Sequence, residues 1–154
     1  IHVMAGFTDR GEAAEDAFRA NLAYACAQAA PHGVSILIEP LNSRDAPGYH
    51  LSDMDHAIST IKAVGAPNLK AMFDCYHIQI MQGDLAKRLE ASLPHIGHIQ
   101  IAAVPDRGEP DAGEINYPWL LPAIDAMGWD GFIGAEYKPR AGTDAGLGWM
   151  ATVR

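Results

Sequence analysis

The stretch Ser35–Asp45, SILIEPLNSRD, places a carboxylate directly after a run of large apolar residues. Ile36–Ile38 has the length and composition of a buried strand, and Glu39 stands where that strand should end. An ionised carboxylate at the edge of an apolar core is destabilising unless a cation or hydrogen-bond donors meet it. Glu39 therefore predicts a charged or hydrogen-bonding partner at the end of this strand.

Four further apolar runs of strand length lie along the chain, and most of them lack the alternation of a half-exposed strand. Continuous apolar runs are typical of strands that are covered on both faces. Together with Ser35–Ile38, the predicted strands are Ile1–Ala5, Leu69–Phe73, Ile96–Ala102 and Phe132–Ala135.

Segments with helical spacing alternate with these strands. The Ala-rich residues 12–30 predict a long amphipathic helix. The second helix is expected to begin near Ser52 and to end at Gly65, the third to follow Asp84, and the fourth to begin at Pro118. Strands that alternate with helices predict a parallel sheet with crossover helices.

Two α/β architectures fit this alternation: a doubly wound sheet of five strands, and part of an eight-stranded (β/α)8 barrel. A complete barrel typically needs about 250 residues. The length of 154 residues favours the open sheet, with residues 1–154 as one domain. The residues at the strand ends favour the barrel, because its strand ends point toward one another across the mouth.

Composition limits the partners of the chain. The net charge of -8 argues against nucleic acid, because proteins that bind it usually present a basic surface. No apolar run has the length of a membrane helix, so we expect no membrane partner. Cys26 and Cys75 lie far apart, as is typical of buried thiols in a cytoplasmic protein. Sequence motifs for dinucleotides, nucleoside triphosphates and serine hydrolases are absent.

Oxygen-bearing side chains stand near the ends of four successive predicted strands. They are Glu39, Asp74, Gln100 and Glu136. The carboxyl ends of parallel strands form the ligand-binding edge of α/β folds, so we expect these side chains to converge. Converging carboxylates raise one another's pKa, whereas a divalent cation stabilises all of them in the ionised form. The mixture of carboxylate and amide oxygens favours Mg²⁺ or Mn²⁺ over Zn²⁺.

Three further residues near the acids are candidates for binding a substrate. His77 follows Asp74 by three residues, at the turn that leaves the same strand. Arg107 could bind a substrate carboxylate through two parallel hydrogen bonds. Lys138 is the other nearby cation, and an ion pair with Glu136 or a neighbouring acid is its alternative role.

Several long stretches resemble the hydroxypyruvate isomerase family, within the xylose isomerase-like (β/α)8 TIM barrels. These stretches are ILIEPLNSRDAPGYHL, FDCYHIQIMQGDLA, HIGHIQIA, GEINYPWL and GAEYKPRAGTDAGLGW. The resemblance covers nearly the whole chain and corresponds to the C-terminal part of a family member. It implies that the five predicted strands are the fourth to the eighth of a barrel, and that the chain is truncated or partial.

The resemblance also implies roles for individual residues. The four strand-end residues would hold a divalent metal, with Glu39 and Glu136 also acting as the acid/base pair. His77 would contact a substrate oxygen, and Arg107 would bind the substrate. The implied reaction interconverts hydroxypyruvate and tartronate semialdehyde through an enediolate, in the manner of an aldose-ketose isomerase. Family habit adds the expectation of a homo-oligomer.

The segment Ala102–Pro110, AAVPDRGEP, departs from the family pattern around Arg107. It therefore leaves a 2-oxo-tetronate isomerase and a ketose 3-epimerase open as alternatives on the same barrel. An abasic-site endonuclease on a similar barrel is disfavoured by the acidic charge. A further alternative is an inactive barrel fragment that needs a partner chain. We expect the full polypeptide to be an active isomerase and residues 1–154 alone to be inactive.

Overall fold

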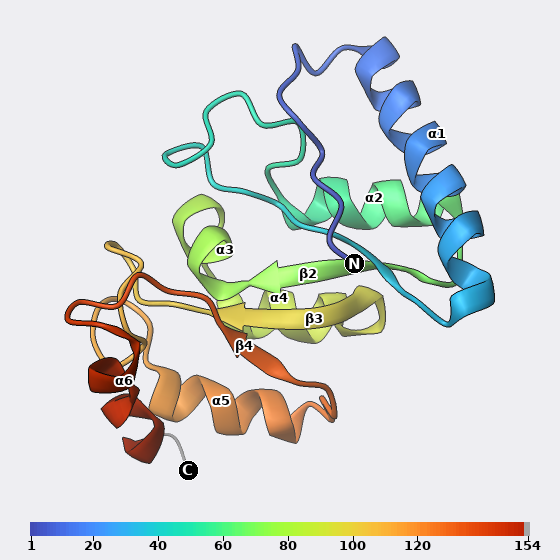
Figure 1. The fold of residues 1–154 in the computed structure, drawn as a ribbon. Coiled ribbons are helices and arrows are strands. Elements are labelled where there is room, and N and C mark those ends of the chain that lie inside the picture. The colour runs from blue at the N-terminus through green and yellow to red at the C-terminus, as the bar shows by residue number, and fades with distance from the viewer. Residues whose placement is uncertain (153–154) are drawn as a thin grey trace.

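A computed structural model describes residues 1–152 of the chain, and its centre is one parallel β-sheet (Figure 1). The four strands lie side by side in the order in which they occur in the sequence. All neighbouring strands are parallel, and a register shift interrupts the pairing of the second and third strands. The strands are β1 (Ile36–Ile38), β2 (Leu69–Asp74), β3 (Ile96–Ile101) and β4 (Ile133–Ala135).

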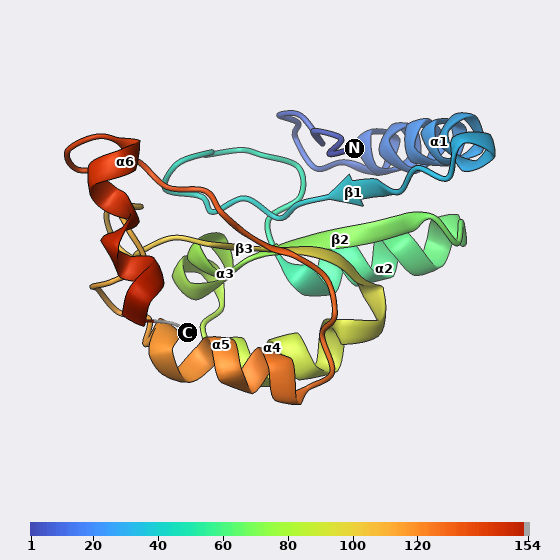
Figure 2. The same cartoon turned by 60° about the horizontal axis from the view of Figure 1, so that its bottom comes forward.

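Helices follow the strands as crossover connections. Figure 2 shows α2, α4 and α5 on one side of the curved sheet, with α1 beyond the β1 edge. None of the helices within residues 1–152 is both long and apolar enough to span a bilayer. The α-helices are α1 (Glu12–Ala29), α2 (Met54–Val64), α3 (Cys75–Met81), α4 (Leu85–Ser92), α5 (Tyr117–Ala126) and α6 (Thr143–Gly146). Short 3₁₀ helices occupy Ala30–His32, Leu93–His95 and Leu147–Thr152.

The two faces of the sheet differ in composition. Paired residues of neighbouring strands point to the same face, and Phe73 pairs with Ile99, which pairs with Ile133. The first two of these side chains are fully buried. The opposite face carries His98 and Gln100, both only partly buried. The expectation that most strands are covered on both faces does not hold for β3, because the helices cover only one face of it.

The predicted strand Ile1–Ala5 is present only as a short extended segment beside β1. Its single bridge pairs His2 with Leu37 in parallel, and the Val3 N–H donates to the Leu37 carbonyl oxygen at 2.8 Å. Gly6 then adopts a positive φ of 79°, which turns the chain away from the sheet. The pairing is therefore shorter than the apolar run suggested.

Helix boundaries follow local chemistry, with one shift from the prediction. Asp53, not Ser52, caps α2, because the Asp53 carboxylate accepts a hydrogen bond from the His56 N–H at 2.7 Å. Gly65 ends the same helix in the left-handed conformation, as predicted. The short helix α3 was not predicted, since Asp74 both ends β2 and caps the helix that follows.

Candidate active site

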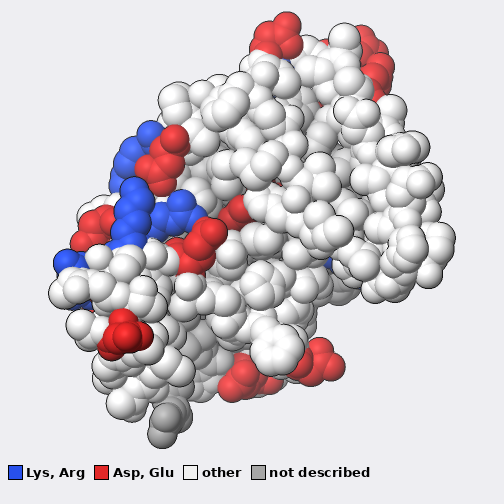
Figure 3. All heavy atoms as spheres, viewed as in Figure 1, with Lys and Arg blue, Asp and Glu red and all other residues white. Residues whose placement is uncertain are grey.

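The four predicted strand-end residues lie at one edge of the sheet. Asp74 pairs in register with Gln100, which pairs with Gly134. Glu39 and Glu136 each follow directly after the last residue of a strand, β1 and β4 respectively. Figure 3 shows that charged side chains of both signs gather at the end toward which the strand arrows of Figure 1 point, while much of the remaining face is uncharged.

Glu39, Asp74 and His77 form a buried cluster at this edge. One ligand atom from each lies within 4.8 Å of those of the other two. Their side chains are almost fully buried, with 4% of Glu39 and 1% of Asp74 exposed. Glu136 is not a member of this group of three, and its side chain is 57% exposed. Three of the predicted residues are thus brought together tightly, and a fourth lies beside them.

Burial and mutual repulsion shift the pKa values of the two buried carboxyls. Burial, followed by the charges of Asp74 and Glu136, raises the pKa of Glu39 to about 8. Burial also raises the pKa of Asp74 to about 6, although the Tyr76 N–H and the Arg107 guanidinium act in the opposite direction. The local charge is therefore unfavourable for ionised carboxylates unless a cation is close.

Arg107 supplies one cation to this cluster. Its Nη2 lies 3.5 Å from Asp74 Oδ2 and forms an ion pair with Glu136. The guanidinium also lies over the Tyr76 ring, with its central carbon 5.0 Å from the ring centroid. The backbone of Arg107 has a positive φ of 58° and donates its N–H to the Ala103 carbonyl oxygen. A tight loop after β3 therefore aims the guanidinium back at the acids.

Hydrogen bonds fix the protonation state of His77. The Asn42 backbone N–H lies 3.0 Å from His77 Nδ1, and a backbone N–H can only donate. Nδ1 therefore accepts, which leaves the proton on Nε2, 3.7 Å from Asp74 Oδ2. Burial and the nearby Arg107 charge lower the pKa of His77 to about 4. His77 is thus a neutral donor that faces the acids, which suits contact with a substrate oxygen better than binding of a metal.

Sequence reasoning missed the residues that hold His77 and Arg107 in place. Asn42 is fully buried, and its side-chain amide contacts both His77 and Asp45. The Tyr76 hydroxyl donates to Asp45 at 2.7 Å. An Asn three residues after Glu39, in a loop leaving an apolar strand, was the available signal. Its partner His77 lies 35 residues away along the chain, so spacing alone could not reveal the pair.

The donor atoms at this edge suit a divalent cation. Glu39 Oε1 and Gln100 Oε1 are buried oxygens with no hydrogen-bond partner among the described residues. Unpaired buried oxygens are costly and are typical of positions where an ion or water completes the coordination. Gly134 pairs with Gln100 in the sheet, and a Cβ at position 134 would stand 2.9 Å from His98 Nε2, so a larger residue there would displace the His98 ring. The cluster is therefore a chemically suitable metal site of the oxygen-rich type.

Lys138 lies apart from the other predicted residues. It is exposed, and within residues 1–152 no carboxylate lies within 4.0 Å of its ammonium group. Glu136, its predicted partner, pairs with Arg107 instead. The Lys138 N–H donates to the Arg107 carbonyl oxygen at 2.7 Å, so this backbone contact is its link to the site.

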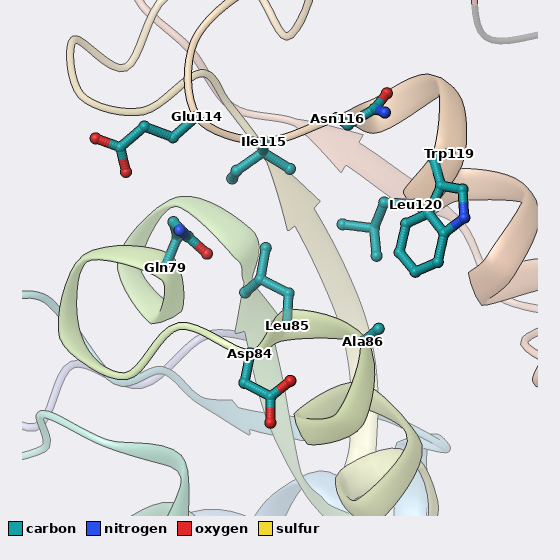
Figure 4. Close-up of a pocket in the computed structure, with 9 residues that line it drawn as sticks. All are labelled: Gln79, Asp84, Leu85, Ala86, Glu114, Ile115, Asn116, Trp119 and Leu120. Carbon is teal, nitrogen blue, oxygen red and sulfur yellow. The ribbon is translucent and has the colours of Figure 1, made fainter.

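A surface pocket lies on the helical side of the sheet, away from the acid cluster. Figure 4 shows it between the starts of α4 and α5, with Trp119 at one end and Glu114 at the other, and Asp84 at its lower edge. None of the predicted site residues lines it. The candidate active site therefore lies at the strand ends and not at this pocket.

Comparison with known proteins assigns the family. The sequence profile described as xylose isomerase-like TIM barrel matches residues 1–153. The chain belongs to this family. The predicted fold, part of a xylose isomerase-like barrel, is thereby confirmed.

The curated proteins to which the chain is similar include a 2-oxo-tetronate isomerase and a hydroxypyruvate isomerase. The chain is 54% identical to a 2-oxo-tetronate isomerase of Cupriavidus necator over 97% of its own length and 59% of the relative's. It is 41% identical to the hydroxypyruvate isomerase of Escherichia coli, covering all of this chain and 61% of that protein. The chain thus spans about three-fifths of the length of these relatives.

A solved structure superposes closely on the chain. A Brucella melitensis protein described as an AP endonuclease of family 2 aligns with a TM-score of 0.95 and 45% identity. The alignment covers 99% of this chain and 60% of that one. The likeness confirms that the open parallel sheet is a portion of a xylose isomerase-like barrel.

Proposed function

We propose that this chain carries the catalytic residues of a metal-dependent isomerase acting on a small hydroxy-oxo acid. The observation that supports the proposal best is the convergence of Glu39, Asp74 and Glu136 around the Arg107 guanidinium at one edge of the sheet. Carboxylates, a neutral histidine donor and an arginine are the groups needed to hold such an acid and move a proton on it. The names of the related isomerases add independent support.

Two carboxylates are available for proton transfer. In an aldose-ketose isomerisation, the carbon that bears a hydroxyl group loses a proton and the neighbouring carbonyl carbon gains one, while the hydroxyl proton moves to the carbonyl oxygen. Glu39 and Glu136 stand at the ends of β1 and β4, so they approach the shared edge from opposite sides of β2 and β3. We assign them as the acid/base pair, with the His77 Nε2–H donating to a substrate oxygen.

The metal ligands in this proposal are Glu39, Asp74, Gln100 and Glu136, and the ion is Mg²⁺ or Mn²⁺. A divalent ion there supplies positive charge beside the substrate oxygens, which makes the neighbouring C–H proton more acidic. Arg107 would bind the substrate's own carboxylate and orient it. The buried residues around the cluster would exclude water from the bound substrate. Electrostatic interactions between the substrate and the charged side chains are stronger where water is excluded.

Hydroxypyruvate and 2-oxo-tetronate are the two substrates to compare. The sequence resemblance favours hydroxypyruvate, whereas the 54% identity to a 2-oxo-tetronate isomerase favours the acid with four carbons. Turnover of each acid should be measured with the whole protein, because residues 1–154 alone are expected to be inactive, after chelation and again after addition of Mn²⁺ or Mg²⁺. We expect chelation to abolish isomerisation and either ion to restore it. Full activity in excess chelator would contradict the metal requirement, and inactivity on both acids would contradict the substrate class.

The Arg107→Lys substitution is expected to raise KM about 10- to 100-fold, with a smaller effect on kcat. A lysine keeps the charge but loses the planar pair of N–H donors, and a hydrogen bond to a charged group is worth about 1.5–3 kcal/mol. Steady-state kinetics measure the two parameters separately. Arg140→Lys is the matched control, because Arg140 pairs with Glu109 and Asp111 in another loop cluster. An unchanged KM in Arg107→Lys would refute the assigned carboxylate contact.

A further inference from the structure

A second cluster of potential metal ligands lies between α1 and α2. It consists of Glu15 on α1, His50 on the loop before α2, and His56 on α2. Both histidines point their Nε2 atoms at the same oxygen, Glu15 Oε2, at 2.9 Å from His50 and 2.8 Å from His56. One ligand atom from each residue lies within 4.8 Å of the other two. No residue of the candidate active site belongs to it.

We propose that Glu15, His50 and His56 bind a late divalent transition metal ion such as Zn²⁺, which joins α1 to α2. Two imidazole nitrogens and one carboxylate oxygen, with water as a fourth ligand, form a common tetrahedral set for this ion. Imidazole ligands separate this site chemically from the oxygen-rich acid cluster, which suits Mg²⁺ or Mn²⁺.

The present geometry is close to that of a tetrahedral site. Zn²⁺ bonds of about 2.0–2.1 Å to nitrogen and oxygen require neighbouring ligand atoms to stand roughly 3.3 Å apart. The two nitrogen-to-oxygen distances are 2.9 Å and 2.8 Å, so each needs to open by only about half an ångström. The His56 side chain is 26% exposed and has room to adjust, whereas the His50 side chain is 2% exposed and fixed.

Surrounding residues already orient two of the ligands. The His50 Nδ1 atom lies 2.8 Å from the Thr8 hydroxyl oxygen, which can accept a hydrogen bond from Nδ1–H when Nε2 binds a metal. Arg19 Nε lies 2.8 Å from Glu15 Oε1, which leaves Oε2 free to face the histidines. The Thr60 hydroxyl donates to the same Oε1 at 3.3 Å. In protein metal sites, neighbouring residues typically form such hydrogen bonds with the ligands.

The charge of the Glu15 carboxylate and the exposure of its side chain also favour metal binding. Burial by itself raises the pKa of Glu15, but hydrogen bonds from His56 and His50 and the charge of Arg19 bring it below its ordinary value. Glu15 is therefore ionised at neutral pH. Its side chain is 19% exposed, so an ion can reach the cluster from solvent beside His56.

Co²⁺ titration of the chelated protein tests the proposal, because four-coordinate Co²⁺ with nitrogen ligands absorbs visible light far more strongly than Co²⁺ in an oxygen-rich octahedral site. We expect intense bands in the wild type and in Asp74→Asn, which removes an acid-cluster ligand only. His56→Gln should lose these bands and bind Zn²⁺ at least about 100-fold more weakly by calorimetry. The glutamine amide can still donate to Glu15, which preserves the fold.

His32→Gln is the matched control. His32 lies in the 3₁₀ helix after α1, outside the cluster, and its substitution should leave the bands and the Zn²⁺ affinity unchanged. Absence of intense bands in the wild type would overturn the proposal. Bands that persist in His56→Gln, or that vanish in Asp74→Asn, would overturn the assignment to these ligands. None of these outcomes bears on the isomerase proposal, because isomerase activity is assigned to the acid cluster of Glu39, Asp74 and Glu136.

Discussion

The Glu136→Gln variant is expected to isomerise its substrate about 10³-fold more slowly than the wild type. A glutamine cannot accept and return a proton, and general acid/base catalysis contributes typically 10²–10⁴-fold. The substitution is nearly isosteric and the side chain is 57% exposed, so the fold should be unaffected. Steady-state kcat with saturating Mn²⁺ is the measurement, with circular dichroism to verify the fold.

Glu114→Gln is the control for this experiment. Glu114 is also an exposed glutamate, on the loop between β3 and α5, and it stands outside the acid cluster. Its kcat should match that of the wild type. If Glu136→Gln also kept wild-type turnover, the acid/base role of Glu136 would be wrong, and the role of Glu39 would need to be tested alone.

In metal-free protein, Glu39→Gln is expected to be more stable than the wild type at pH 9 and equally stable at pH 4. The fold raises the pKa of the Glu39 carboxyl from 4.5 to about 8, so the folded state holds this proton more tightly than the unfolded chain does. Stability that is present below pH 4.5 is therefore lost as the pH rises through about 8. The loss is on the order of 5 kcal/mol, or roughly 10–20 °C in Tm for a domain of this size.

Thermal unfolding across this pH range measures the effect, in chelator and again with Mn²⁺. In chelator, the Tm difference between the variant and the wild type should grow between pH 5 and pH 9. With Mn²⁺ it should shrink or reverse, because the ion stabilises the ionised Glu39 of the wild type only. Glu114→Gln should follow the wild type throughout. Parallel curves for Glu39→Gln and the wild type would show that Glu39 does not carry the buried charge inferred here.

The strands could be predicted from the sequence because their apolar runs are long and distinct. The run before Glu39 and the run before Asp74 both became strands within a residue of the expected bounds. The sequence predicted the start of a helix less well where two neighbouring residues could both serve as its N-cap. Ser52 and Asp53 are both good helix caps, and only the backbone conformation decided between them. Helix α3 has seven residues, too few for a helical period to stand out.

The convergence of the acids also follows from the sequence. Parallel strands end at the same edge of a sheet, so residues that follow successive strands are brought together whatever lies between them. This places Glu39, Asp74, Gln100 and Glu136 at one edge. The roles assigned to Glu39 and Glu136 remain predictions that the two substitutions test, and the metal-binding role of all four residues is tested by chelation.

Tertiary structure decided the details that depend on contacts between distant segments. A hydrogen bond from Asn42 determines which nitrogen of His77 carries the proton. The loop after β3 orients the Arg107 guanidinium toward the acids, whereas Lys138 lies outside the cluster. Glu15, His50 and His56 form no recognisable spacing motif in the sequence. They come together only because α1 packs against α2.

By itself, the sequence determined which residues stand at the ends of successive strands, since the succession of strands along the chain and the alternation of their side chains are properties of the chain. Only the tertiary structure decided the charge and the hydrogen-bond partner of each residue there. The physical reason is that pKa values and proton positions depend on burial and on neighbours within a few ångströms, and packing supplies these neighbours from remote parts of the chain.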